Sequence, residues 1–191
     1  MTSSATPTMR SDAASNRQRV LVAGARVFSE NGVEATLNDV ARSAGVGVAT
    51  VYRNFPNRDA LLDGLFQIKL DQLIELADRT AGIDDASTAF DAYLRSVMEA
   101  HAMDRGVVPV LMRATQSAQF AEELAVQLGP RVQPLIEAAQ VAGSLRDGFT
   151  IQDLCLLSAM VGSVADLTRD TQPTLWERYA QMLIDGTRPP V

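Results

Sequence analysis

The sequence predicts an all-α fold of nine or ten helices. Of its 191 residues, 47% are apolar and only 5% are aromatic, and the β-branched residues do not gather into alternating runs. Apolar residues recur instead at three- and four-residue steps, and residues that start or stop helices stand between the runs. We therefore expect a small N-terminal module of three helices, joined by a long fourth helix to a larger helical body.

The chain begins with a segment that has no helical pattern. Residues 1–15 are rich in serine, threonine and alanine without periodicity, which predicts a disordered tail. From Arg17 apolar residues recur at helical spacing, and "ENG" at residues 30–32 provides a stop signal. The first helix is expected between these limits, at the start of a domain covering residues 16–60.

A second, short helix is expected after Thr36. Threonine is a good N-cap, and Asp39 stands three residues later as a capping-box partner. Gly45 ends the helix, and we expect it to adopt the positive φ that glycine tolerates.

A third short helix follows the turn, with Val51 and Phe55 on one buried face. Pro56 ends it. The fourth helix then begins at Arg58 and is expected to continue to about residue 79.

The remaining residues, 80–191, form the larger helical body. Gly129 and Pro130 are expected to interrupt the helical pattern, and Thr150 is expected to cap a helix. The expected helices cover 84–103, a stretch with Pro109 in its first turn, 118–128, 134–141, 151–168 and 174–184.

The stretch "AGVGVATVYRNF" at residues 44–55 has two glycines one residue apart, as phosphate-binding loops do. A dinucleotide loop needs a preceding strand and a third glycine, where this chain has a helix and Thr50. The Gly-Lys-Ser/Thr ending of a Walker loop is also missing. A short helix, a glycine turn and a second short helix are instead the layout of a helix-turn-helix, whose second helix enters the major groove of DNA.

The residues expected to face DNA follow from this layout once Val46, Val51 and Phe55 are turned inward. Arg53 is the one long donor able to bind guanine or phosphate. Thr36 and Arg58 stand at helix N-termini and are expected to hold the DNA backbone. On the helix after the turn, the outward residues are Gly47, Val48, Ala49, Thr50, Tyr52, Arg53 and Asn54.

Positive charge is concentrated in the N-terminal third of the chain, as expected for a DNA-binding module at that end. The protein carries a net charge of −6, but residues 1–60 hold seven arginines and five acidic residues, a local charge of +2. A basic module attached to an acidic body is typical of a protein that meets phosphates at one end only.

The stretch "RVLVAGARVFSENGVEATLNDVARSAGVGVATVYRNFPNRDALL" resembles the DNA-binding domain of the TetR family of transcriptional repressors. The resemblance implies that Thr36, Tyr52 and Arg58 hold the DNA backbone while the third helix reads bases. Asn54 stands where the family often has histidine, and Arg58 where it often has lysine. The last two thirds of the chain are then expected to be the family's helical ligand-binding and dimerisation domain.

The resemblance also implies a homodimer, formed by the last two long helices. Small and apolar residues on these helices permit close approach of a partner, but the same faces could pack inside the subunit. The residues expected at the dimer interface are Leu154, Ser158, Val161, Gly162, Ala165, Trp176, Tyr179 and Leu183.

The same resemblance places a pocket for a small apolar effector in the C-terminal body. Methionine suits an adaptable pocket, although a methionine-rich core has the same sequence pattern, and a lone histidine near a helix end is often a cap or solvated. The candidate effector-binding residues are Met98, His101, Met112, Phe120 and Phe149.

Other function classes lack the residues they need. One cysteine, Cys155, and one histidine, His101, leave no disulfide, no metal cage and no nucleophile–base pair, so we expect no enzyme, metal or cofactor. No signal peptide or membrane span is expected, which places the protein in the cytoplasm. The leading hypothesis is a dimeric repressor released from operator DNA by an effector, and the alternative is a dimeric DNA-binding protein that senses no ligand.

Overall fold

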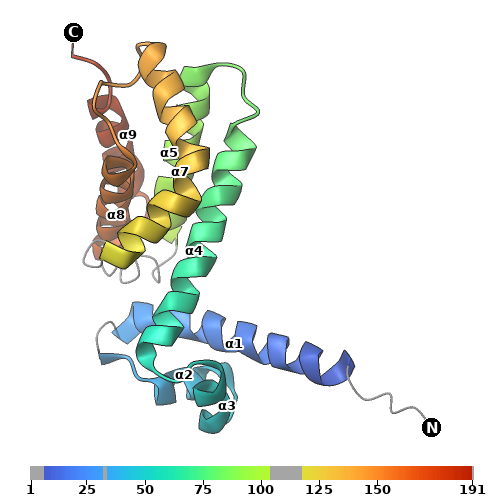
Figure 1. The fold of residues 1–191 in the computed structure, drawn as a ribbon. Helices are drawn as coiled ribbons and strands as arrows, with labels where there is room; N and C mark the ends of the chain where they lie inside the picture. Colours follow the sequence, from blue (N-terminus) through green and yellow to red (C-terminus); the bar gives the residue numbers. More distant parts are fainter. Residues whose placement is uncertain (1–6, 32–33, 104–117, 191) are drawn as a thin grey trace. The chain divides into compact units, whose positions relative to one another are not determined.

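The protein is described by a computed structural model that covers residues 7–31, 34–103 and 118–190. All secondary structure in these ranges is helical, which confirms the predicted fold class (Figure 1). The chain divides into two compact units, residues 1–67 and 68–191, and the division falls inside the fourth helix. The described helices are α1 (Pro7–Asn31), α2 (Leu37–Ala44), α3 (Val48–Asn54), α4 (Arg58–Thr80), α5 (Ala86–Met103), α7 (Ala118–Val141), α8 (Ile151–Thr168) and α9 (Leu175–Gly186).

Helix α1 begins earlier than the sequence pattern indicates. It starts at Pro7 rather than near Arg17, so the prediction of a disordered tail is wrong for residues 7–15. Proline is favoured at the first position of a helix. Alanine, methionine and arginine then extend a helix at little cost once the amphipathic part downstream has nucleated it.

Helix α2 has the capping box that the sequence predicts. The Thr36 hydroxyl accepts a hydrogen bond from the Asp39 backbone N–H, and the Asp39 carboxylate accepts one from the Thr36 backbone N–H at 3.1 Å. Gly45 follows with φ 63°, as expected for a glycine that ends a helix. The position and length of this short helix are therefore set by its own ends.

The core of the N-terminal unit forms where α1, α2, α3 and the start of α4 meet. Val51 and Phe55 are buried as predicted, whereas Val46 is only half-buried. Arg17 lies over the Phe55 ring and Arg58 over the Phe28 ring, each 5.0 Å from the ring centre. The other buried apolar residues of this core include Val20, Leu21, Val27, Val40, Ala41, Leu61, Leu62 and Leu65.

Helix α7 is one continuous helix, so the predicted interruption at Gly129 and Pro130 is wrong. Pro130 and Pro134 both lie inside it. Its buried face continues on both sides of the two prolines, from Leu128 before them to Ile136 after them. Gly129 lacks the Cβ that clashes with a following proline, which removes part of the penalty for a helical residue before Pro130.

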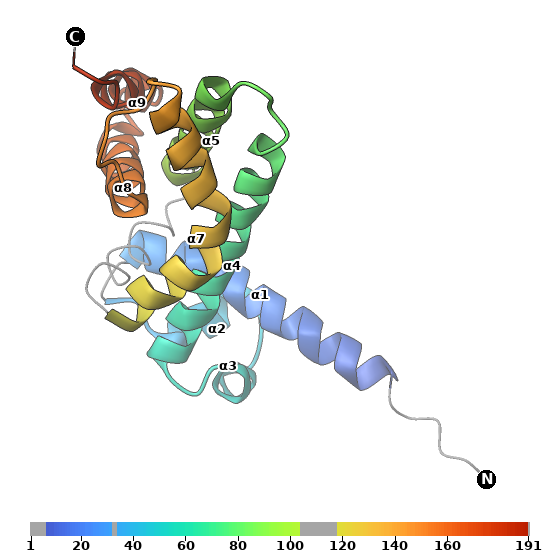
Figure 2. The same ribbon diagram turned by 45° about the horizontal axis from the view of Figure 1, so that its top comes forward.

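The C-terminal unit is built around α5, which packs against α7, α8 and α9 (Figures 1 and 2). Phe90 of α5 meets Phe149 edge to face, with ring centres 5.6 Å apart. The Tyr93 hydroxyl donates to the Leu73 carbonyl of α4 at 3.5 Å, and Arg131 of α7 lies 3.4 Å from Asp78 of α4. These contacts place the second half of α4 in this unit.

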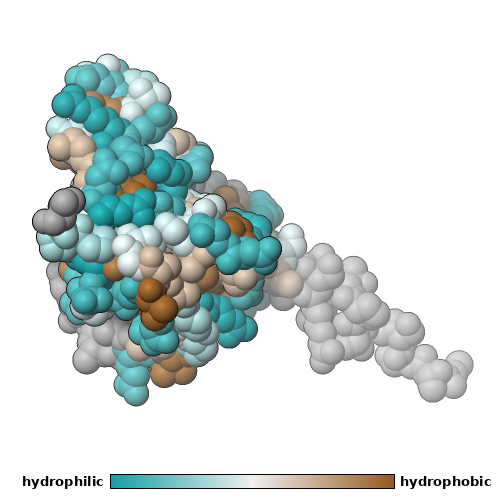
Figure 3. Space-filling view, turned by 90° about the horizontal axis from the view of Figure 1, so that it is seen from above, coloured by the Kyte–Doolittle hydropathy of each residue, from teal (hydrophilic) through white to brown (hydrophobic). Residues whose placement is uncertain are grey.

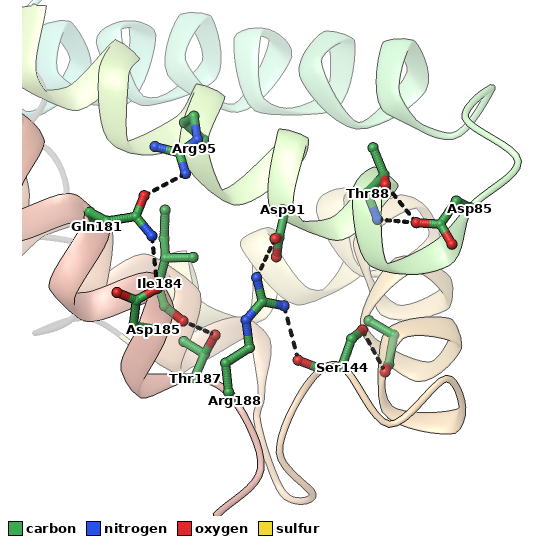
Figure 4. A network of polar contacts seen from close by, with 11 residues as sticks. Asp85, Thr88, Asp91, Arg95, Ser144, Gln181, Ile184, Asp185, Thr187 and Arg188 are labelled. Atoms are coloured by element: carbon green, nitrogen blue, oxygen red, sulfur yellow. Dashed lines mark hydrogen bonds and ion pairs between the residues drawn. The ribbon is translucent and has the colours of Figure 1, made fainter.

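Polar contacts tie the end of the chain to α5 (Figure 4). Arg188 forms an ion pair with Asp91 of α5 and donates to the Ser144 carbonyl at 3.1 Å. Arg95 donates to Gln181 of α9 at 2.8 Å. The residues after α9 are thereby held against both α5 and the loop between α7 and α8.

Helix α8 is the one described helix that is long and apolar enough to cross a membrane by composition alone. Its buried residues pack against α5 and α9, which is the behaviour of a core helix. On the face of the molecule in Figure 3, hydrophobic residues appear as separate patches among hydrophilic ones.

Candidate nucleic-acid interface

The turn between α2 and α3 is fixed by an arginine from α1. Arg19 donates to the Ala44 carbonyl at 2.8 Å and to the Gly45 carbonyl at 3.3 Å. Arg26, two turns later on α1, donates to the Ser43 hydroxyl at 3.0 Å. The two Arg19 bonds satisfy carbonyls at the end of α2, where an isolated helix would leave them without partners.

Sequence reasoning missed Arg19 and Arg26. Both were within the predicted first helix, but their partners lie 17 to 26 residues further along the chain. No local spacing signals such a pair, because it arises only when α1 packs across α2.

Helix α3 is amphipathic in the way the helix-turn-helix layout requires. Val51 is fully buried, while Val48, Ala49, Tyr52 and Arg53 are exposed. A Cβ added to Gly47 would meet no other atom within 4 Å, so nothing in the described part of the chain requires glycine at this position. The predicted outward face is thus present around Gly47, Val48, Ala49, Tyr52 and Arg53.

The remaining polar residues of α3 are partly engaged with the helix itself. Arg53 donates to the Thr50 hydroxyl at 3.1 Å, which orients its guanidinium along the helix. The Asn54 amide donates to the Thr50 carbonyl at 2.8 Å, and both Thr50 and Asn54 are half-buried. Asn54 therefore has less free hydrogen-bonding capacity than its predicted place in the interface suggests.

Thr36 is exposed, but its hydroxyl proton is shared with Asp39. The hydroxyl donates to the Asp39 carboxylate at 2.5 Å. This bond, followed by the bond from the Thr36 backbone, lowers the pKa of Asp39 from its ordinary value. A phosphate that took the Thr36 hydroxyl would have to compete with an ionised Asp39.

Arg58 begins α4 and is half-buried against the Phe28 ring. Asn57, just before it, accepts a hydrogen bond from the Ala60 backbone at 2.8 Å and so caps the helix. The contact with Phe28 limits the directions in which the Arg58 guanidinium can point.

The predicted dimer residues lie mostly inside the subunit. The face of α8 with small side chains packs on α5, because those side chains let α5 approach closely. Tyr179 remains exposed and Leu183 half-buried. The residues buried within the chain are Leu154, Ser158, Val161, Gly162, Ala165 and Trp176.

A different face of α8 and α9 carries exposed apolar side chains. Leu156, Met160 and Leu167 follow one another at helical spacing on α8, and Tyr179 and Met182 are exposed on α9. A surface groove of about 600 Å³ runs between the two helices and includes Leu156, Met160 and Met182.

The predicted effector residues are not all brought together. Met98 and His101 are buried one turn apart on α5, whereas Phe149 packs on Phe90. Eight residues separate Phe90 from Met98, which is roughly 12 Å along a helix. Met112 lies outside the described residues, as does the side chain of Phe120.

Within the described ranges, no group of three or more His, Cys, Asp or Glu side chains could hold a metal ion. Cys155 is buried, and this burial raises its pKa to about 11. Burial also raises the pKa of Tyr93, to which Cys155 adds a smaller contribution. Both groups stay neutral near pH 7 and behave as core residues.

Comparison with known families identifies both parts of the chain. Residues 20–65 match the family described as bacterial regulatory proteins, tetR family. Residues 85–189, more than half of the chain, match the family described as transcriptional regulator SbtR-like, C-terminal domain.

Curated relatives match over a shorter stretch. An HTH-type transcriptional regulator of Staphylococcus aureus (strain USA300) is 39% identical over 67 residues, which is 35% of this chain and 36% of the relative. The alignment thus spans about a third of the length of the curated relatives.

Solved structures match over nearly the whole chain. A TetR transcriptional regulator from Streptomyces coelicolor is 27% identical with a TM-score of 0.59, over 92% of this chain and 99% of that one. The regulator FadR from Bacillus subtilis, in complex with stearoyl-CoA, is 19% identical with a TM-score of 0.67, over 88% of this chain and 98% of that one.

Proposed function

Because the chain belongs to the TetR family of bacterial regulatory proteins, we propose that it is a DNA-binding transcriptional regulator that acts in the cytoplasm. In this proposal α3 enters the major groove of double-stranded operator DNA. The N-terminal unit supplies the contacts to DNA, and the C-terminal unit supplies dimerisation and regulation.

The observation that carries the proposal is the exposed face of α3 on a fixed turn. Arg53 is exposed and oriented by Thr50, so its guanidinium can bind a guanine edge. Tyr52 is exposed beside it, and its hydroxyl suits a phosphate oxygen. Thr36 and Arg58 flank α3 at helix N-termini and would hold the backbone on either side.

We propose that the regulator works as a homodimer, because operators with two-fold symmetry need two recognition helices. Support comes from the exposed apolar side chains of α8 and α9, which would be buried from solvent by contact with a second copy of the chain. The proposed interface consists of Leu156, Met160, Leu167, Tyr179, Met182 and Leu183.

We further propose that the regulator is a repressor released by a small apolar effector in the C-terminal unit. The similarity to FadR, whose structure holds stearoyl-CoA, supports an apolar ligand. Helix α4 runs without a break from Arg58 to Thr80 and would carry the change between the units. To release DNA, the effector must bind the DNA-incompetent arrangement more tightly, by about 1.4 kcal/mol per tenfold change in affinity.

One observation favours a dimer that senses no ligand. Phe149 packs on Phe90, roughly two turns along α5 from Met98 and about three turns from His101. Of the candidate residues whose side chains the structure describes, Phe149 therefore lies apart from Met98 and His101 along α5. In that alternative the C-terminal unit serves only to dimerise.

Selection of duplexes from random sequence tests the DNA-binding function. The purified protein should enrich a two-fold symmetric site, and the control variant Arg79→Ala, which removes an exposed charge from the C-terminal unit, should enrich the same site. A library that stays random after repeated rounds would exclude sequence-specific binding.

Calorimetry with and without the selected duplex tests the ligand switch. An effector found by screening should bind more weakly to the DNA complex, by the same factor by which it weakens DNA binding. Equal effector affinity in the two titrations would contradict release by ligand and favour the non-sensing dimer.

A further inference from the structure

The residues at the start of α3, from Gly47 to Ala49, have no hydrogen-bonding side chain, and the hydroxyl of Thr50 that follows them is bound by Arg53. Gly47 has no side chain, Ala49 is exposed, and Val48 between them is 43% exposed. Val48 is not among the buried core residues, whereas Val51, one turn later, is fully buried. The exposed part of the Val48 side chain is therefore available for contact with another molecule.

The polar side chains of α3 lie further along the helix. Arg53 and Asn54 stand at its end, and both donate to Thr50. Tyr52 shares a face with Val48, since the two are four residues apart, and it is 48% exposed. The exposed face of α3 therefore changes from apolar at Val48 to polar at Arg53.

This order of side chains limits what each end of α3 can recognise. In the major groove, donors and acceptors distinguish all four base pairs, and the C5-methyl group of thymine is the one apolar feature. The favourable apolar contact that a valine side chain can make with a base edge is therefore with that methyl group.

We propose that Val48 determines specificity by packing against the C5-methyl group of a thymine in each half of the operator. The inference rests on the proposed DNA-binding function and names a base feature that the function requires. Gly47 and Ala49 contribute by being small, so that Val48 can approach the base edge.

Single replacement of thymine by deoxyuridine in the duplex recovered by selection tests the proposal, because it removes one methyl group and no hydrogen bond. Each half-site should contain one thymine at which a single replacement weakens binding about fourfold, which is the effect of losing one buried methyl-sized group. In the Val48→Ala variant the same replacement should hardly change the affinity for DNA, because the valine methyl groups that pack on the thymine methyl are missing.

Val22→Ala is the matched control. It makes the same change at an exposed valine of α1 in the same unit, and it should keep the full dependence on the thymine methyl. Circular dichroism should show that both variants fold, because neither valine is buried.

The results separate the two claims. If no sequence is selected, the DNA-binding function fails, and the inference with it. If a specific site is bound but no uridine replacement weakens it more than twofold, Val48 does not read thymine. An equal loss for the wild type and Val48→Ala at the same thymine would likewise assign that methyl group to another residue.

Discussion

Gly47 is the residue at which folding and DNA binding can be separated. Its φ of −65° is open to any residue, and an added Cβ would meet no atom within 4 Å. Serine is a good N-cap, so Gly47→Ser should keep or slightly raise the melting temperature. It should nevertheless weaken binding to the selected duplex, because the new side chain lies where the base edge approaches. Unchanged DNA affinity would show that this part of α3 stays away from the groove.

Cys155 reports the integrity of the C-terminal unit. Burial raises its pKa from 9.0 to about 11, so the native thiol stays neutral at pH 8 and should react far more slowly with iodoacetamide than the unfolded chain does. Between about pH 9 and pH 11 only the unfolded thiol ionises, so stability falls as pH rises through this range. Rapid labelling of the native protein at pH 8 would show that α8 leaves the core readily.

At the scale of single residues, the exposed face of α3 could be predicted from the sequence, but the contacts of the arginines on α1 could not. Arg53 was recognised as a donor because it lies in the helix-turn-helix pattern. Arg19 looked like any solvated arginine on α1, and its bonds to Ala44 and Gly45 depend on how α1 crosses α2.

At the scale of elements, Gly64 decides how closely α4 can pack in the N-terminal unit. A Cβ there would lie 2.9 Å from Leu21 Cδ2 and 3.1 Å from Phe55 Cε1. Gly64→Ala should therefore lower the free energy of unfolding by about 1 to 2 kcal/mol, the overpacking cost less the gain in helix propensity. It should also weaken DNA binding, because Phe55 ends α3.

Gly186→Ala is the control for this change. A Cβ at Gly186, in the last turn of α9, would meet nothing within 4 Å. Urea unfolding should show little change for this variant, and a Gly64→Ala variant as stable as the wild type would show that α4 does not pack as described.

The helices with signals at their own ends were predictable, and those shaped by neighbours were not. Thr36 and Asp39 placed α2, and Thr150 placed α8, because capping boxes act within four residues. Helix α7 was divided wrongly, since its continuity depends on a buried face that tertiary packing supplies on both sides of Pro130. The outward face of α3 followed from periodicity, whereas the face that α8 leaves exposed depended on where α5 packs.

At the scale of the whole molecule, the proposed dimer predicts different effects of a glutamate at two neighbouring residues of α8. Met160 is 53% exposed and Val161 is fully buried. Met160→Glu should give a folded monomer, because the charge is tolerated in water but not in a dimer interface. Val161→Glu should destabilise the subunit itself. Sedimentation velocity with circular dichroism distinguishes these results, and a dimer that persists in Met160→Glu would place the interface elsewhere.

The most direct test of sequence reading by α3 is the ratio of affinities for the selected duplex and a scrambled duplex at one salt concentration. The wild type should prefer the selected duplex by roughly a thousandfold or more, as specific DNA-binding proteins do. Arg53→Ala should lower this preference by about 10- to 100-fold, because it removes a base contact, while Arg79→Ala should leave it unchanged. A wild-type ratio near one, or an Arg53→Ala variant with the full preference, would contradict recognition of operator DNA by α3.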